Sequence, residues 1–136
     1  MTVELDHMIV YSRDKRVAAA FFTELLGLPP ATPAGKFLAV RIGHGVSLDF
    51  ADARADVVAQ HYAFAVSDEE FAAVMARIHE RRLPYWADPQ RTQADQIADR
   101  GAGCRAVYFA DPSGHWLEVL TPGRSASSPG SRSPAT

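Results

Sequence analysis

Two histidines and two acids occupy matching places in two halves of the sequence. His7 and His61 each lie in an apolar segment that precedes a helical pattern, and Asp49 and Glu118 each lie in the last apolar segment of the same half. Two imidazoles and one carboxylate are a common ligand set for Zn, Fe(II), Mn, Co or Ni, and they leave coordination positions open for a substrate. The pattern therefore predicts a divalent-metal site.

The predicted direction of the side chains places these candidates on a common face. Successive residues of a strand point to opposite faces of a sheet. In the segments that contain His61, Asp49 and Glu118, bulky apolar residues fill the alternate positions and are expected to pack against helices. His7 likewise shares a face with Ile9, away from the helix side. A carboxylate on such a face needs a partner, because burying an unpaired charge is costly, and a metal ion would supply one.

The elements that position these residues follow the same order in both halves. In the first half, a strand is followed by a helical stripe that ends at Gly27, a proline-rich loop and a hairpin. The expected ranges are a strand at 3–11, a helix through 17–26, a loop at 28–35 and strands at 37–42 and 46–50.

The second half repeats this order with an insertion. A strand precedes a helix that opens with the capping box of Ser67 and Glu70 and stops at Pro84. The insertion is a polar loop, and loops of that length are often functional. The expected ranges are strands at 61–66 and 85–86, the loop at 89–103, and strands at 104–110 and 115–120 joined by a turn at 111–114.

The composition is that of one ordinary globular domain. The chain has 136 residues, a formal net charge of -2 and a single cysteine. The near-neutral charge gives no reason to expect nucleic acid or a membrane as partner, and one cysteine forms no intrachain disulfide. The N-terminus does not have the pattern of a secretory signal, and no apolar run is long enough to span a membrane. We therefore expect a cytoplasmic protein, and the open coordination positions of the predicted metal site favour a small-molecule partner.

Three stretches resemble the vicinal oxygen chelate superfamily, which includes glyoxalase I, extradiol dioxygenases, fosfomycin-resistance thiol transferases and bleomycin-binding proteins. The resemblance covers about residues 3–121, and its most specific part is the strand-DPxGxxxE-strand pattern. The stretches are Leu5–Val10 (LDHMIV), His61–Val66 (HYAFAV) and Val107–Glu118 (VYFADPSGHWLE).

This resemblance implies an α+β fold with two βαβββ modules that form a cupped mixed sheet, with the helices packed on the convex face. It places the metal ligands at His7, His61 and Glu118. Asp49 falls where glyoxalase I enzymes carry a glutamate as fourth ligand, and its side chain is one methylene shorter. The family usually pairs modules across a dimer, so a homodimer is expected, with His7 and His61 reaching one metal from different chains.

The domain boundaries follow from the same pattern. One domain is expected at residues 1–122, with a first module at about 3–51 and a second at about 60–121. Residues 123–136 are mostly Gly, Ser and Pro and predict a flexible tail.

The leading functional hypothesis is a metal-dependent lyase or isomerase of glyoxalase type, acting on a substrate with adjacent oxygens. Glu118 or Asp49 would move the proton, and Tyr108, whose neighbours on its face are alanines, would contact the substrate or pack in the core. One alternative is an Fe(II) extradiol-type dioxygenase with the same ligands. Another is a non-catalytic protein that binds a drug or metabolite and confers resistance. Arg100 lies in the polar loop, which is a candidate cover for the cup; it could anchor an anionic substrate, but a surface position is the default for an arginine.

Overall fold

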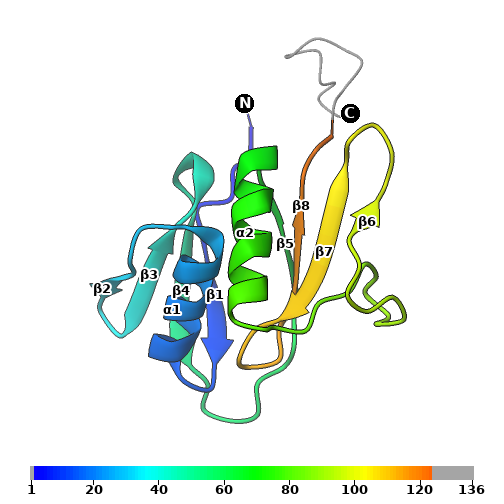
Figure 1. The fold of residues 1–136 in the computed structure, drawn as a ribbon. Helices are drawn as coiled ribbons and strands as arrows, with labels where there is room; N and C mark the ends of the chain where they lie inside the picture. Colours follow the sequence, from blue (N-terminus) through cyan, green and yellow to red (C-terminus); the bar gives the residue numbers. More distant parts are fainter. Residues whose placement is uncertain (1, 124–136) are drawn as a thin grey trace.

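The computed structural model describes residues 2–123 of the chain. Two helices lie on one side of two four-stranded sheets, which stand next to each other in Figure 1. The first sheet contains β1 (His7–Ser12), β2 (Thr32–Ala34), β3 (Phe37–Arg41) and β4 (Ser47–Asp52), and the second contains β5 (His61–Ala65), β6 (Ala98–Asp99), β7 (Arg105–Ala110) and β8 (Trp116–Leu120). The helices are α1 (Lys15–Leu26) and α2 (Asp68–Glu80), with a short 3-10 turn at Gly43–Gly45.

Both sheets have the same topology, which confirms the predicted pair of βαβββ modules. The strand orders are β1-β4-β3-β2 and β5-β8-β7-β6. In each module the first strand pairs in parallel with the last strand, and the other pairings are antiparallel. The first strand of each module, β1 or β5, is therefore an edge strand, and it carries the histidine of that module at its first position.

The core lies between the helices and one face of each sheet. Phe22 of α1 packs edge-on against Phe50 of β4, with ring centroids 4.9 Å apart, and both side chains are fully buried. Leu117 and Val119 fill the same role in β8. These are the bulky alternate residues of the sequence pattern, so the predicted direction of the strands is confirmed. The opposite faces, which carry the histidines, are not covered by the helices, and we call them the cup faces.

The ends of both helices have the expected chemistry. The Asp14 carboxylate accepts hydrogen bonds from two backbone N–H groups of the first turn of α1, and Gly27 ends this helix in the left-handed conformation that favours glycine. Ser67 and Glu70 form the predicted capping box of α2. These caps fix where each helix starts, and therefore how its apolar side faces the sheet.

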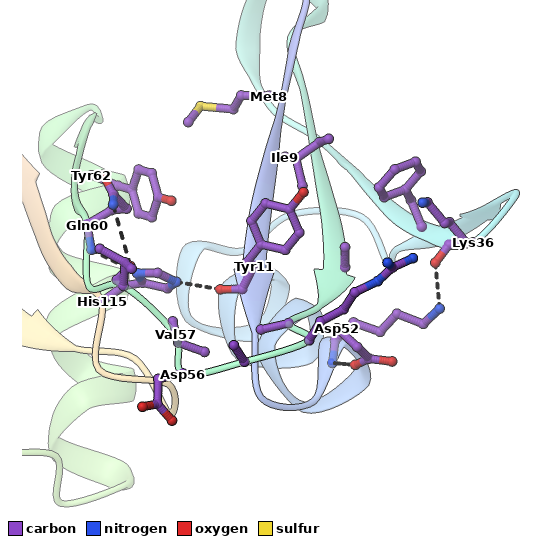
Figure 2. Close-up of a pocket in the computed structure, with 17 residues that line it drawn as sticks. Met8, Ile9, Tyr11, Lys36, Asp52, Asp56, Val57, Gln60, Tyr62 and His115 are labelled. Atoms are coloured by element: carbon purple, nitrogen blue, oxygen red, sulfur yellow. Dashed lines mark hydrogen bonds between the residues drawn. The ribbon is translucent and has the colours of Figure 1, made fainter.

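His115 connects the two modules (Figure 2). This side chain is 1% exposed; its Nδ1 accepts the backbone N–H of Gln60 at 3.0 Å, and its Nε2 donates to the carbonyl oxygen of Tyr11 at 2.7 Å. His115 therefore bonds both to the connector, which is the segment 53–60 between the modules, and to β1 of the other module. The turn before it is held by the Asp111 carboxylate, which accepts the backbone N–H groups of Ser113 and His115.

Several boundaries differ from those expected. The first strand begins at His7 because the preceding segment forms no ladder beyond one bond, from the Ser47 N–H to the Asp6 carbonyl. The loop at 89–103 contains β6, and the strand expected at 85–86 is reduced to bridges made by Trp86. Apart from Gly123, the predicted tail lies outside the described residues. Neither helix within 2–123 is long and apolar enough to cross a membrane.

Candidate metal centre

His61 and Glu118 meet on the cup face of the second module. They lie on β5 and β8, which pair in parallel with Ala63 opposite Glu118. The Nε2 of His61 is 3.1 Å from the Oε1 of Glu118. The Glu118 side chain is 11% exposed and that of His61 is 45% exposed. An imidazole nitrogen and a carboxylate oxygen therefore converge at the surface of the cup, and each atom is a possible metal donor.

The other oxygen of Glu118 is held by Arg100. The guanidinium is 3.0 Å from Oε2, and it also donates to the Tyr108 hydroxyl at 2.6 Å. Burial alone would lower the pKa of Arg100, but the hydrogen bond and the charge of Glu118 raise it overall. Burial and the charge of Glu118 raise the pKa of Tyr108. Both groups are therefore hydrogen-bond donors next to the carboxylate at neutral pH.

Sequence reasoning considered Arg100 as an anchor for an anionic substrate but missed its contacts with Glu118 and Tyr108. The residue lies directly after β6, within the insertion that distinguishes the second module from the first. Its backbone N–H bonds to the carbonyl of Cys104, so the guanidinium enters the cup from a short hairpin. The available signal was the insertion itself, because an arginine in a long loop before a carboxylate-bearing strand pair is a candidate partner. Only the fold shows the direction in which it points.

His7 lies on the cup face of the first module, with its side chain 59% exposed. Its Nδ1 donates to the Asp6 carboxylate at 2.8 Å, and this hydrogen bond and the charge of Asp6 raise the pKa of His7. Asp49 contributes a smaller attraction, and one of its oxygens accepts the Ser47 hydroxyl at 2.7 Å. Because Nδ1 bonds to Asp6, the donor available to a metal is Nε2, and a carboxylate partner on the other ring nitrogen is typical of histidine ligands.

The four sequence candidates therefore form two separate groups within one chain, His61 with Glu118 and His7 near Asp49. Among residues 2–123, no three His, Cys, Asp or Glu side chains come together to hold a metal ion. Each group still has the donor chemistry that a divalent transition metal prefers. Within residues 2–123 of one chain, the two groups therefore do not combine into a site with three such ligands.

A pocket of about 850 Å³ lies where the two modules join (Figure 2). It is lined by β1, including Ile9 and Tyr11 of the cup face, by Lys15, Lys36 and Phe37, and by residues between 51 and 60, and His115 and Tyr62 form one side. It does not include His61 or Glu118. The chemistry of the His61–Glu118 pair, rather than the pocket, therefore identifies the candidate centre.

Three comparisons with known proteins complete the description of the site. The model of the Glyoxalase/Bleomycin resistance protein/Dioxygenase superfamily matches residues 4–119. Glutathione transferase FosA of Serratia marcescens is 30% identical over 125 residues, which are 88% of this chain and 81% of FosA. The structure of Oxidase ChaP-H1 is 44% identical, with a TM-score of 0.84, and the match covers 88% of this chain and 96% of that one. Oxidase ChaP-H2 is also 44% identical, with a TM-score of 0.86 and coverage of 92% and 98%.

Proposed function

The chain belongs to the Glyoxalase/Bleomycin resistance protein/Dioxygenase superfamily, and from this premise we propose that it is a metal-dependent oxidase of a small molecule with adjacent oxygens. The observation that carries the proposal is the 44% identity, over nearly the full length of both chains, with two oxidases. The identity with FosA is lower, at 30%. Oxidation therefore takes precedence over the glyoxalase-type isomerisation that the sequence alone favoured.

The residues that would hold the metal are His7, His61 and Glu118. Two histidines and one carboxylate with open positions are typical of non-heme Fe(II) oxygenases, and Fe(II) is therefore the metal that we propose. When bound, such a metal supplies a Lewis acid for the substrate oxygens and a redox centre. The residues around the metal would orient the ligands and the substrate and move the proton.

Glu118 is oriented by two partners. Arg100 fixes one carboxylate oxygen, so that the other faces His61. Tyr108 keeps its proton and is positioned to donate a hydrogen bond to a substrate oxygen, because its raised pKa disfavours the phenolate. One oxygen of Asp49 accepts the Ser47 hydroxyl, and the other has no hydrogen-bond partner within residues 2–123, so we retain Asp49 as the candidate proton acceptor or fourth ligand. The partners around the ligands are expected to affect metal affinity as strongly as many ligands do.

We also propose that the protein is a homodimer in which one copy contributes His7 and the other contributes His61 and Glu118. The separation of the two groups within one chain supports this arrangement. A two-fold symmetric dimer then contains two identical metal centres, since each copy gives both kinds of half-site.

The test begins with the metal. The protein is purified, loaded with Fe(II) without oxygen, and assayed for iron content and for oxygen uptake with catechols, with the hemithioacetal of an α-ketoaldehyde as the substrate of the competing isomerase. His7→Ala and His61→Ala are each expected to lose the iron. Unchanged iron content in both variants would refute the site, and isomerisation without oxygen uptake would refute the reaction. Tight ligand binding in chelator without turnover would favour the non-catalytic alternative.

Mixing the two variants tests the shared site. When His7→Ala and His61→Ala chains are co-expressed with different tags, half of the dimers are mixed, and each mixed dimer contains one intact centre. Iron content and activity should therefore return to about a quarter of the wild-type values. A site formed within one chain would show no recovery, because every chain then lacks one ligand.

A further inference from the structure

Both tryptophans of the chain lie together on the cup face of the second module. The sequence contains two, Trp86 and Trp116. Trp116 is on β8, two residues from Glu118 and therefore on the same face. Trp86 pairs with Tyr108, which in turn pairs with Glu118. Cross-strand partners share a face, so the three aromatic residues lie on the same face as Glu118. We call Trp86, Tyr108 and Trp116 the aromatic platform.

The rings of the platform form a continuous row from the proposed metal ligand. The centroid of His61 is 6.0 Å from that of Tyr108, which lies 6.1 Å from Trp116 at an interplanar angle of 20°. Trp86 and Trp116 are 5.4 Å apart. Both tryptophans are partly exposed, whereas the large phenylalanines of the core are fully buried on the helix side. Trp86 and Trp116 therefore form the accessible part of the platform, and Tyr108, which is 5% exposed, lies buried beside them.

Arg91 covers this surface. Its guanidinium carbon lies 4.3 Å from the centroid of Trp116 and 5.4 Å from that of Trp86. The residue is exposed, and it has a positive φ of 62° in a turn where Asp88 accepts the N–H groups of Thr92 and Gln93. A cation over an exposed ring is held only weakly. The 4.3 Å contact leaves no room for another ring, so a ligand stacking here must displace the guanidinium.

Trp116 has a second unusual feature. Its indole Nε1 is buried and has no hydrogen-bond partner within residues 2–123. Buried donors are nearly always paired, because an unpaired one carries its full desolvation cost. An oxygen atom at the edge of a bound ligand would give this donor an acceptor.

We propose that the aromatic platform is a binding surface for a planar aromatic ligand, which stacks on Trp116 in the place of the Arg91 guanidinium. One part of this proposal rests on the proposed function: the aromatic ligand is taken to be the substrate, and its adjacent oxygens reach His61 and Glu118. Stacking itself does not need the metal, so binding and turnover can be tested separately. In nucleic-acid binding, any base can stack on an aromatic side chain, because stacking uses only the π face of the base. Any flat aromatic ring system can stack in the same way.

The experiment is calorimetry on the metal-free, full-length protein in chelator. The probes are 2,3-dihydroxynaphthalene and cis-1,2-cyclohexanediol, which both have adjacent oxygens but differ in aromaticity. We expect the naphthalene diol to bind at least about tenfold more tightly, and Trp116→Leu to weaken that binding by about tenfold to a hundredfold. Because all tryptophan emission comes from the platform, binding should also quench the intrinsic fluorescence.

Two further variants refine the result. Arg91→Ala should bind the naphthalene diol as tightly as the wild type or more tightly, since the cover is removed. Tyr85→Leu is the matched control, because Tyr85 is next to Trp86 in sequence but packs against the core and His79, and its loss should leave affinity unchanged. If Trp116→Leu does not fold, Trp86→Leu replaces it.

Three outcomes of the binding experiments would overturn the proposal. These are equal affinity for the two probes, unchanged binding in a folded platform variant, and calorimetric binding without quenching. Emission that changes on protein dilution but not with the probe would also overturn it, because the platform would then be a contact between copies. Tight binding of the aromatic probe without oxygen uptake by the iron-loaded protein would contradict the proposed oxidase activity but would still support the platform as a binding surface.

Discussion

Glu118 is balanced between two kinds of neighbour. One oxygen faces His61 and the other faces Arg100, while burial leaves little water to stabilise the charge. A carboxylate in such a place depends on its partners, because an unpaired buried charge is strongly destabilising. The negative charge of Glu118 is therefore compensated by Arg100 and, in our proposal, also by a bound metal ion.

Arg100→Leu tests this balance. In chelator the variant should lose about 1–2 kcal/mol in the free energy of unfolding, since Glu118 is left with one partner. The value is below that of a fully buried pair because the arginine side chain is 38% exposed and water replaces part of the interaction. Saturating Zn(II) should reduce the difference in the free energy of unfolding between the wild type and the variant, since a bound cation compensates the charge of the same carboxylate. The measurement is urea unfolding with and without the metal.

The matched control for this substitution is Arg41→Leu. Arg41 is an exposed arginine on β3, away from Glu118, and its removal should change the free energy of unfolding by less than about 0.5 kcal/mol. An Arg100→Leu protein as stable as the wild type in chelator would contradict the proposed dependence of Glu118 on this residue.

At the scale of single residues, the sequence predicts positions better than partners. The strand period placed His61 and Glu118 on one face because alternation depends only on local geometry. It placed Asp49 on the corresponding face of the other module, where the structure shows its bond to Ser47. It could not predict that Arg100 turns inward, because a loop residue has no periodic neighbours that define its direction.

At the scale of elements, the β7–β8 turn shows how a buried acid organises a loop. Asp111 is 5% exposed and accepts two backbone N–H groups with one oxygen, while the other oxygen is buried without a partner within residues 2–123. Burial raises the pKa of Asp111, against the lowering influence of the N–H bonds and of His115. The turn sets the register that brings Tyr108 opposite Glu118, so its stability bears on the site.

This shift predicts a pH dependence. Since the pKa of Asp111 is higher in the folded state than the ordinary value of 3.8, the folded state binds the proton more tightly, and this stabilisation is lost as the pH rises through the folded pKa. In Asp111→Asn the contribution is absent. The free energy of unfolding of the variant minus that of the wild type should therefore increase from pH of about 4 to pH 7. Urea unfolding at several pH values measures it, and a constant difference would contradict the prediction.

Elements were predicted most reliably where a local signal defines them. The capping box and the glycine that ends α1 gave the helix ends, and the Asp-Pro-Ser-Gly turn gave the last hairpin. The insertion at 89–103 was expected as a loop because β6 is only two residues long, and so short a strand has no detectable period. The role of His115 was likewise hidden, because its partners, Gln60 and Tyr11, are distant in sequence.

At the scale of the whole molecule, the cup faces are the sides of the two sheets that no helix covers within residues 2–123. The helix side of both sheets is packed, whereas Ile9 and Tyr11 of β1 are 40% and 52% exposed beside His7. Apolar residues on a sheet face are normally covered when they lie in a row. No local pattern in the sequence describes a contact with a second copy, so the expected dimer came only from the family resemblance, and it remains a prediction.

Ile9→Lys tests whether this face pairs with a second copy. A symmetric dimer carries the substitution twice, so the dissociation constant should rise by about a hundredfold or more, and sedimentation velocity should show monomers at concentrations where the wild type is dimeric. Iron content should fall in parallel, since His7 would no longer meet His61 and Glu118. Val17→Lys is the matched control: Val17 is 51% exposed on α1, on the helix side, and the same change there should leave both the dimer and the iron unaffected. Loss of the dimer with full retention of iron would show that the metal centre is complete within one chain, and a monomeric wild-type protein that binds iron would do the same.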